Sequence, residues 1–193
     1  DNGGLLKAAF DWDARSMVTA TAYTAPSYAV GGSLFHFAQG AVVLGGTVTA
    51  PTTTALATGG TAVANVKDFS FKLDNGMGDS RYLIGGAGLK GSAAPRGLRS
   101  GTGKLTLELT DTVARDAILA DTELALMLTF TSTEVLSTGF ATLQIVLPAV
   151  KLDGEMPKAT GVLPTIEATY TMLDNLTAAQ PVWGVLRTSD STL

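Results

Sequence analysis

Along five stretches of the chain, large apolar residues alternate with small or polar ones. These stretches span residues 66–74, 104–110, 123–132, 141–152 and 165–172. Successive side chains of a β-strand point to opposite faces, so a period of two predicts strands. Each strand has one dry face and one more polar face, which is rich in threonine at residues 104–110, 123–132 and 165–172, a pattern that is typical of antiparallel sheets.

One helical segment interrupts the strands. Residues 111–120 begin with Asp111, a suitable N-cap, and place Val113, Ala117 and Ala120 on one face. The 193 residues are enough for one domain with its own core. We therefore expect residues 1–193 to form a single, mainly β domain: an antiparallel β-sandwich or barrel with one short flanking α-helix.

The remaining segments are less regular. Residues 1–32 have no firm assignment, since a short helix and a strand both fit parts of them. Two short strands are expected around Gly40. Residues 47–65 form a Thr/Ala/Gly-rich segment that we expect to be a covered loop or an edge strand, and residues 85–103 a Gly-rich basic loop.

Composition argues against enzyme chemistry. The chain contains no cysteine and one histidine, His36, which lies between two phenylalanines in a strand-like run. Disulfides, thiolate metal sites and cysteine nucleophiles are thereby excluded. The glycines of residues 86–91 match a dinucleotide-binding spacing, but no helix follows them. We expect no catalytic site, no cofactor and no metal.

Charged residues make up only 16% of the chain, and its net charge is −4. A surface so poor in charge favours protein contacts, while an acidic chain is a weak candidate for gripping nucleic acid. No apolar run approaches the roughly 20 residues of a membrane span. Residue 1 is Asp and not Met, so we expect an upstream segment.

The pair Asn75-Gly76 is a strong hairpin signal, yet the next alternating run begins only at residue 104. Five basic residues and no acid occur from Arg81 to Lys104, whereas six acids and one base occur from Glu108 to Glu134. The pattern indicates a basic arm that docks on an acidic patch of a second copy; a chance imbalance or a DNA-binding arm are the alternatives. Arm candidates are Asn75, Gly76, Arg81, Lys90, Arg96 and Arg99, and patch candidates are Asp111, Asp116, Asp121 and Glu123.

Several segments together resemble a known family. The runs "FSFKLDNG", "RSGTGKLTLELTD", "LALMLTFTS", "LQIVLPAVKLDGEMPKATG" and "TIEATYTML" are similar to the major tail tube proteins of long-tailed bacteriophages, and "LPAVKLDG" followed by "TG" is the most specific part. The resemblance implies a virion protein of the phage tail, whose hexameric rings stack into a hollow tube. It also implies that sheets of neighbouring copies join around a channel for the genome. The implied partners are further copies, the tape measure, tail terminator and distal tail proteins, and double-stranded DNA that passes without tight binding.

The polar strand faces supply candidates for the channel wall. They are Thr106, Glu108, Thr129, Thr131, Thr142, Gln144, Glu167 and Thr169. The pattern leaves open whether this polar face meets the channel or the outer solvent. Two other functions remain possible at this stage: a different virion component, such as a capsid decoration or tail-completion protein, and a surface-exposed β-sandwich adhesin or binding module.

Overall fold

The computed structural model describes residues 4–12, 14, 19–23, 25, 34–77, 82–91, 97–137, 139–155 and 163–188. In these residues the chain is mainly β with one α-helix, as the sequence predicts, and the strands form no closed barrel. The elements are a 3-10 turn (Phe37–Gln39), β1 (Gly40–Leu44), β2 (Val48–Thr49), β3 (Thr58–Gly59), β4 (Ala62–Val63), β5 (Val66–Asp74), β6 (Ser100–Glu108), α1 (Val113–Ala120), β7 (Glu123–Leu136), β8 (Gly139–Gly154), β9 (Thr165–Met172) and β10 (Trp183–Arg187).

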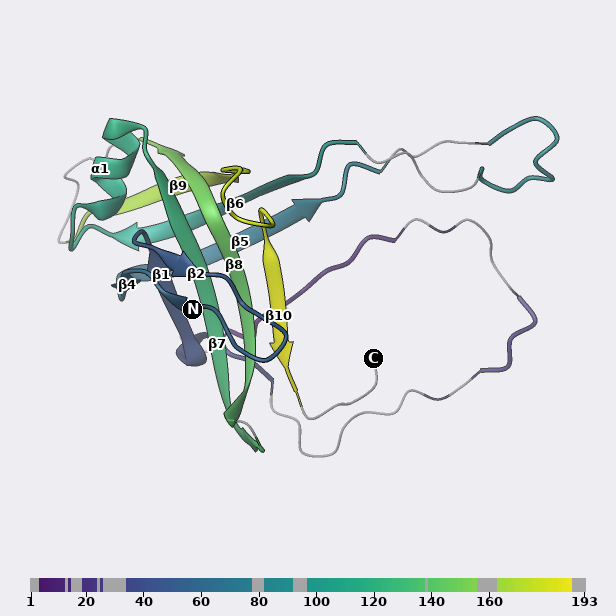
Figure 1. Ribbon diagram of the computed structural model, residues 1–193, viewed down its shortest axis with the longest axis horizontal. Helices are drawn as coiled ribbons and strands as arrows, with labels where there is room; N and C mark the ends of the chain where they lie inside the picture. The colour runs from purple at the N-terminus through teal and green to yellow at the C-terminus, as the bar shows by residue number, and fades with distance from the viewer. Residues whose placement is uncertain are drawn as a thin grey trace.

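The main sheet is antiparallel and has the strand order β4-β1-β7-β8-β9-β6-β5. Strand β8 is shared between two halves of this sheet: its first half pairs with β10, and its last residues pair with β9. Figure 1 shows β7, β8 and β10 crossing the direction of β5, β6 and β9 at a steep angle. The sheet therefore bends over itself and encloses a core between its two halves.

The predicted dry faces fill this core. Buried side chains alternate along β6, β7 and β9: Leu105, Leu107, Leu126, Leu128, Ile166, Ala168 and Tyr170. The rings of Phe69 on β5 and Phe130 on β7 lie 5.6 Å apart and join the two halves. Helix α1 adds Ala114 and Ala117 to the same cluster. Burial of alternate apolar side chains thus holds the bent sheet together.

Helix α1 begins two residues later than predicted. Thr112 occupies the N-cap position, while the Oδ1 atom of Asp111 accepts a hydrogen bond from the Val113 N–H at 3.1 Å. Asp121 ends the helix in the left-handed region, at φ 54°. Of the predicted apolar face, Ala117 is buried and Ala120 is exposed. The element is confirmed, but its buried face centres on Ala114 and Ala117.

Three segments differ from the sequence expectations. Only one regular strand, β1, forms around Gly40, because the residues before it make a 3-10 turn. Strand β10 had no counterpart in the sequence reading. The described residues between 4 and 25 form neither helix nor strand, apart from an isolated bridge between Leu5 and His36.

Candidate assembly surfaces

The Thr-rich segment covers one of the two polar sheet faces. Residues 47–60, here named the strap, pair β2 with β3 and lie against the outer side of β7, β8 and β10. Beneath the strap, Ala57, Met127 and Val146 form a small second core, with Val43 and Trp183 partly buried beside it. Most residues of the strap are themselves exposed, so this segment covers the sheet and is not covered by it, while residues 62–63 form the edge strand β4.

Gln144 fastens the strap to β8. Its Oε1 atom accepts a hydrogen bond from the Ala57 N–H at 2.9 Å, and its Nε2 atom donates to the Ala57 carbonyl at 3.2 Å. Nε2 also donates to Oγ1 of Thr129 at 3.1 Å. Nearby, Arg187 Nη2 donates to Oγ1 of Thr142 at 3.0 Å. Gln144 and Thr142 are buried and Thr129 is half-buried. These three channel candidates therefore make hydrogen bonds within the subunit and do not face a channel.

The other polar face is uncovered. It consists of the outward side chains of β5, β6, β9 and the end of β8, and is here named the open face. Its members include Ser70, Lys72, Thr102, Lys104, Thr106, Glu108, Asp153, Glu167, Thr169 and Thr171. Thr106 lies opposite Glu167, and Lys104 opposite Thr169. Four channel candidates are thus brought together here, whereas Thr131 is exposed on β7.

Tyr170 locks the inner side of this half-sheet. Its hydroxyl donates a hydrogen bond to the Ser70 carbonyl at 2.7 Å, reaching past Gly103 on the strand between them. A Cβ atom at Gly103 would collide with both the Tyr170 hydroxyl and the Ser70 carbonyl oxygen. Burial raises the pKa of Tyr170 far above its ordinary value. Glycine is therefore required at position 103 by the close approach of Tyr170 and Ser70.

Residues 75–77, 82–91 and 97–99, the described part of the segment between β5 and β6, project from the open face half of the sheet and are here named the arm (Figure 1). On the two sides of the arm, β5 and β6 pair with each other, and Asp74 at the end of β5 lies opposite Ser100 at the start of β6. The loop predicted to end at residue 103 therefore ends at residue 99. Inside the arm, the Gly97 N–H donates to the Gly76 carbonyl at 2.7 Å, and Tyr82 bridges Lys90. Asn75-Gly76 therefore lies at the base of the arm and is not its turn, because the chain pairs again further out, at Tyr82 and Lys90.

The arm tip exposes apolar side chains. Tyr82 and Leu83 are mostly exposed, and Ile84 is fully exposed. Gly76, at φ 60°, lets the two chain segments at the base of the arm approach, because a Cβ there would lie 2.5 Å from the Leu98 carbonyl oxygen. Of the predicted basic residues, Lys90 and Arg99 are described, while Arg81 and Arg96 lie outside the described residues.

The acidic candidates gather around α1. Asp116 forms an ion pair with Arg115 at 2.7 Å, and a hydrogen bond from Thr112, followed by Arg115, lowers the pKa of its carboxyl. Asp121 pairs with Lys151 at 2.8 Å and raises the pKa of that lysine. Asn65 donates to Asp111 at 3.1 Å, and Glu123 is exposed. Several of these carboxylates therefore already have partners within the chain.

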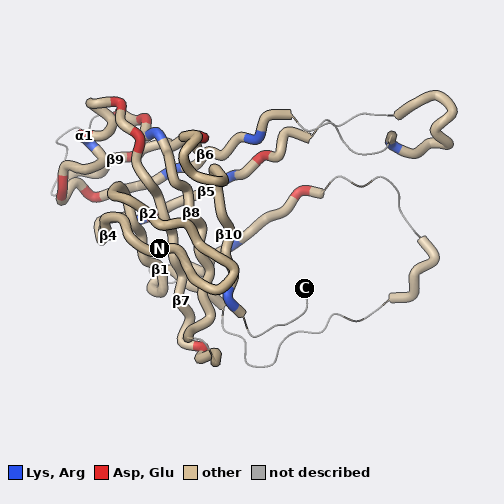
Figure 2. Tube along the Cα trace, in the orientation of Figure 1, with Lys and Arg blue, Asp and Glu red and all other residues tan. Residues whose placement is uncertain are grey.

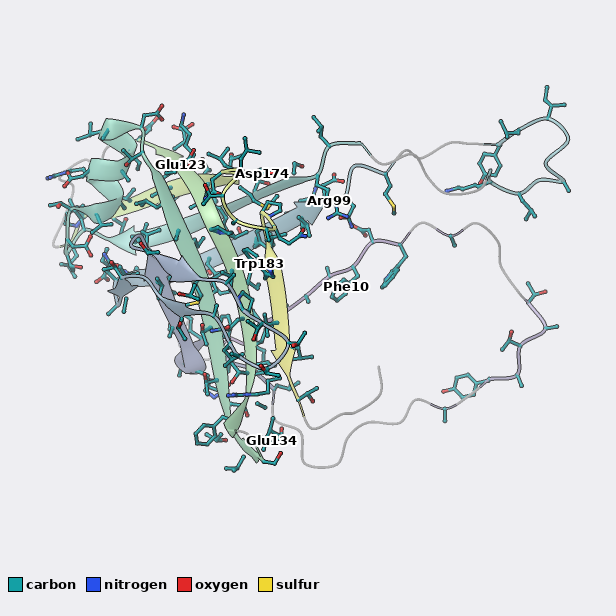
Figure 3. The ribbon with its side chains drawn as sticks, in the orientation of Figure 1. Phe10, Arg99, Glu123, Glu134, Asp174 and Trp183 are labelled. Carbon is teal, nitrogen blue, oxygen red and sulfur yellow. The ribbon has the colours of Figure 1, made fainter. Side chains whose placement is uncertain are left out.

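The arm and the acidic end lie on opposite sides of the molecule. Figure 2 shows acidic residues around α1 at one end and the arm, with its lysine and arginine positions, reaching away at the other. Figure 3 likewise separates Glu123, beside α1, from Arg99, at the base of the arm. One copy cannot bring these two surfaces together, so a contact between them needs a second copy.

A comparison with protein families identifies the chain's relatives. The family model described as phage tail tube protein matches residues 1–172, which extend from the first residue to the end of β9. The chain belongs to the phage tail tube protein family. No curated protein matches it.

Family membership places this tail tube protein in the virion tail as a structural component. It implies a non-enzymatic role and assembly with itself and with other tail proteins. Within the part of the tail tube protein that the structure describes, no helix is long and apolar enough to cross a membrane. The relevant surfaces of this protein are therefore those that meet other tail subunits.

Two features of the tail tube protein escaped the sequence reading. The strap covers a face that alternates like the open face, and the contact that fixes it joins residues 87 positions apart. Only the lack of charge in residues 47–65 gave a signal. The apolar arm tip was visible as "YLI" within a basic stretch, but the charges around it dominated the interpretation.

Proposed function

We propose that this tail tube protein assembles into stacked, hexameric rings whose channel carries the genome into the host. In this arrangement the open face lines the channel, and the arm links one ring to the next. The ring number comes from the family resemblance. The contact between rings is derived from the positions of the arm and of the acidic end.

The open face has the properties that a channel wall requires. It is the uncovered one of the two Thr-rich faces, and its outward side chains are hydroxyl or charged groups. Strand β5 stands at one end of the strand order and has a partner on one side only among the described strands. A free edge of this kind pairs readily with another chain, and closure of a ring removes it.

The observation that carries the proposal is the opposite placement of the arm and the acidic end. A contact between two different surfaces of identical copies is heterologous, and it continues from copy to copy until a ring closes or a fibre grows. Basic arm residues and acidic residues near α1 are complementary in charge, which favours register more than affinity. The exposed apolar tip supplies surface that gains from burial.

Assembly through the arm is tested by making its tip polar. We expect Leu83→Asp with Ile84→Asp to yield folded subunits that no longer form tubes by negative-stain microscopy, because the apolar tip loses its contact. Leu176→Asp, at an equally exposed apolar position outside the arm, is the control and should polymerise normally. Tubes of normal length from the arm variant would refute the role of the tip.

The channel assignment has its own test. Thr106→Lys with Thr169→Lys should leave tubes assembled but slow DNA ejection from particles, because lysines on the channel wall bind phosphates. Thr133→Lys with Thr53→Lys, at exposed positions on β7 and on the strap, adds the same charge away from the open face and is the matched comparison. Normal ejection from the double variant would count against the open face as the channel wall.

A further inference from the structure

Two of the lysines associated with the open face are held by carboxylates. Lys104 Nζ lies 3.2 Å from Glu167 Oε2, and Lys67 Nζ lies 2.9 Å from Glu108 Oε1. Glu108 and Glu167 are the two acidic residues among the channel candidates. Each of the four side chains retains some exposure, from 27% for Glu108 to 68% for Glu167, so each lysine is reachable from solvent once its partner is removed.

The register of the strands fixes the Lys104 pair. Lys104 stands opposite Thr169, and Glu167 stands opposite Thr106, so the ion pair runs diagonally across β6 and β9. Diagonal neighbours on one face are within reach of long side chains. Exposed pairs of this type contribute about 0–1 kcal/mol to stability, which leaves their effect on the charge of the surface as the larger consequence.

Free lysines on a channel wall bind DNA. Each lysine that neutralises a phosphate releases a counterion and steepens the dependence of log affinity on log salt by about 0.9. A lysine already paired with a carboxylate must give up that partner first. A wall with paired lysines therefore offers DNA little phosphate affinity.

We propose that Glu108 and Glu167 act as neutralising residues that prevent Lys67 and Lys104 from binding DNA phosphates as the genome passes. This inference rests on the proposed function, because it requires the open face to meet DNA. Lys72 lies on the same face and forms no ion pair within the described residues. On the open face, Lys72 therefore remains available to contact a phosphate in the unaltered subunit.

The test measures binding of a short DNA duplex to folded subunits between 50 and 200 mM salt. Glu108→Gln with Glu167→Gln frees two lysines. The loss of affinity across this fourfold change in salt should therefore be about 12 times larger than for the unaltered protein. Adding Lys67→Gln and Lys104→Gln should restore the original slope. Asp11→Asn with Glu155→Gln changes the net charge by the same amount at two exposed positions and should leave the slope unchanged.

The outcomes separate this inference from the proposed function. Tubes that assemble from the Glu108→Gln, Glu167→Gln variant with an unaltered DNA slope would overturn the inference alone. An equally steeper salt dependence of DNA binding in the Asp11→Asn, Glu155→Gln control would also overturn it, since the change in net charge and not the release of the lysines would then be the cause. Failure of the unaltered protein to form tubes would remove the proposed function itself.

Discussion

Replacement of Gln144 with leucine is expected to destabilise the strap strongly. Leucine has a similar side-chain volume but lacks the amide, which makes four hydrogen bonds: two to the backbone of Ala57, one to Thr129 and a long one to the sulfur of Met127. The Ala57 N–H and carbonyl then remain buried without these partners, at a cost of about 1–3 kcal/mol for each group. Leucine recovers part of this by apolar contact with the second core. We expect a net loss of about 2–4 kcal/mol in the free energy of unfolding.

The free energy of unfolding is measured by urea denaturation followed by circular dichroism. Gln144→Leu is compared with Gln144 in the Leu83→Asp, Ile84→Asp background, which we expect not to polymerise. The same loss should lower the melting temperature by roughly 5–15 °C for a domain of this size. Hydrogen exchange of the Ala57 amide should also become much faster. Gln180→Leu, at an exposed position, is the control and should change stability by less than about 0.5 kcal/mol. A Gln144→Leu variant as stable as that control would refute the idea that the amide holds the strap.

Three further predictions concern the half-sheet under the open face. Tyr170→Phe should cost about 1 kcal/mol in urea denaturation, because it removes the hydrogen bond to Ser70; unchanged stability would contradict this. The raised pKa of Tyr170 means that the unfolded chain loses its phenolic proton first, so stability should be constant below about pH 10 and fall above it, and Tyr170→Phe should lack this fall. Gly103→Ala should destabilise the subunit by several kcal/mol, roughly the range of other overpacked sites, because its Cβ meets Ser70 and Tyr170. Gly184→Ala, where nothing lies within 4 Å, is the matched comparison, and equal melting temperatures for the two variants would refute the packing argument.

The strands could be predicted from sequence because their signal is local. Leu105 and Leu107, or Ile166 and Ala168, face the core since each follows the period of two within its own strand. The family resemblance rested on the same strands, and the family match confirms it. Helix α1 was predictable for a similar reason, since its apolar spacing and the Asp111 carboxylate beside its start lie within one short segment.

The candidate surfaces were harder because they depend on contacts between distant segments. Gln144 and Glu167 occupy equivalent places in alternating strands, yet one is buried under the strap and the other lies open. Local pattern cannot distinguish them, since the covering residue, Ala57, lies far away in the chain. The pairing of β5 with β6 across the arm was missed for the same reason: the 25 residues between the two strands hide it from any short window.

The continuity of the arm with β5 and β6 has a mechanical consequence. The arm begins directly after β5 and ends directly before β6, and β6 is bonded on one side to β5 and on the other to β9. Tension applied at the tip runs parallel to these strands, whereas their hydrogen bonds are perpendicular to them. Such a pull shears the β6–β9 ladder as a unit and does not peel its bonds open one at a time. A tube strained along its axis would thus transmit the load into the β5–β6–β9 half of each subunit's sheet.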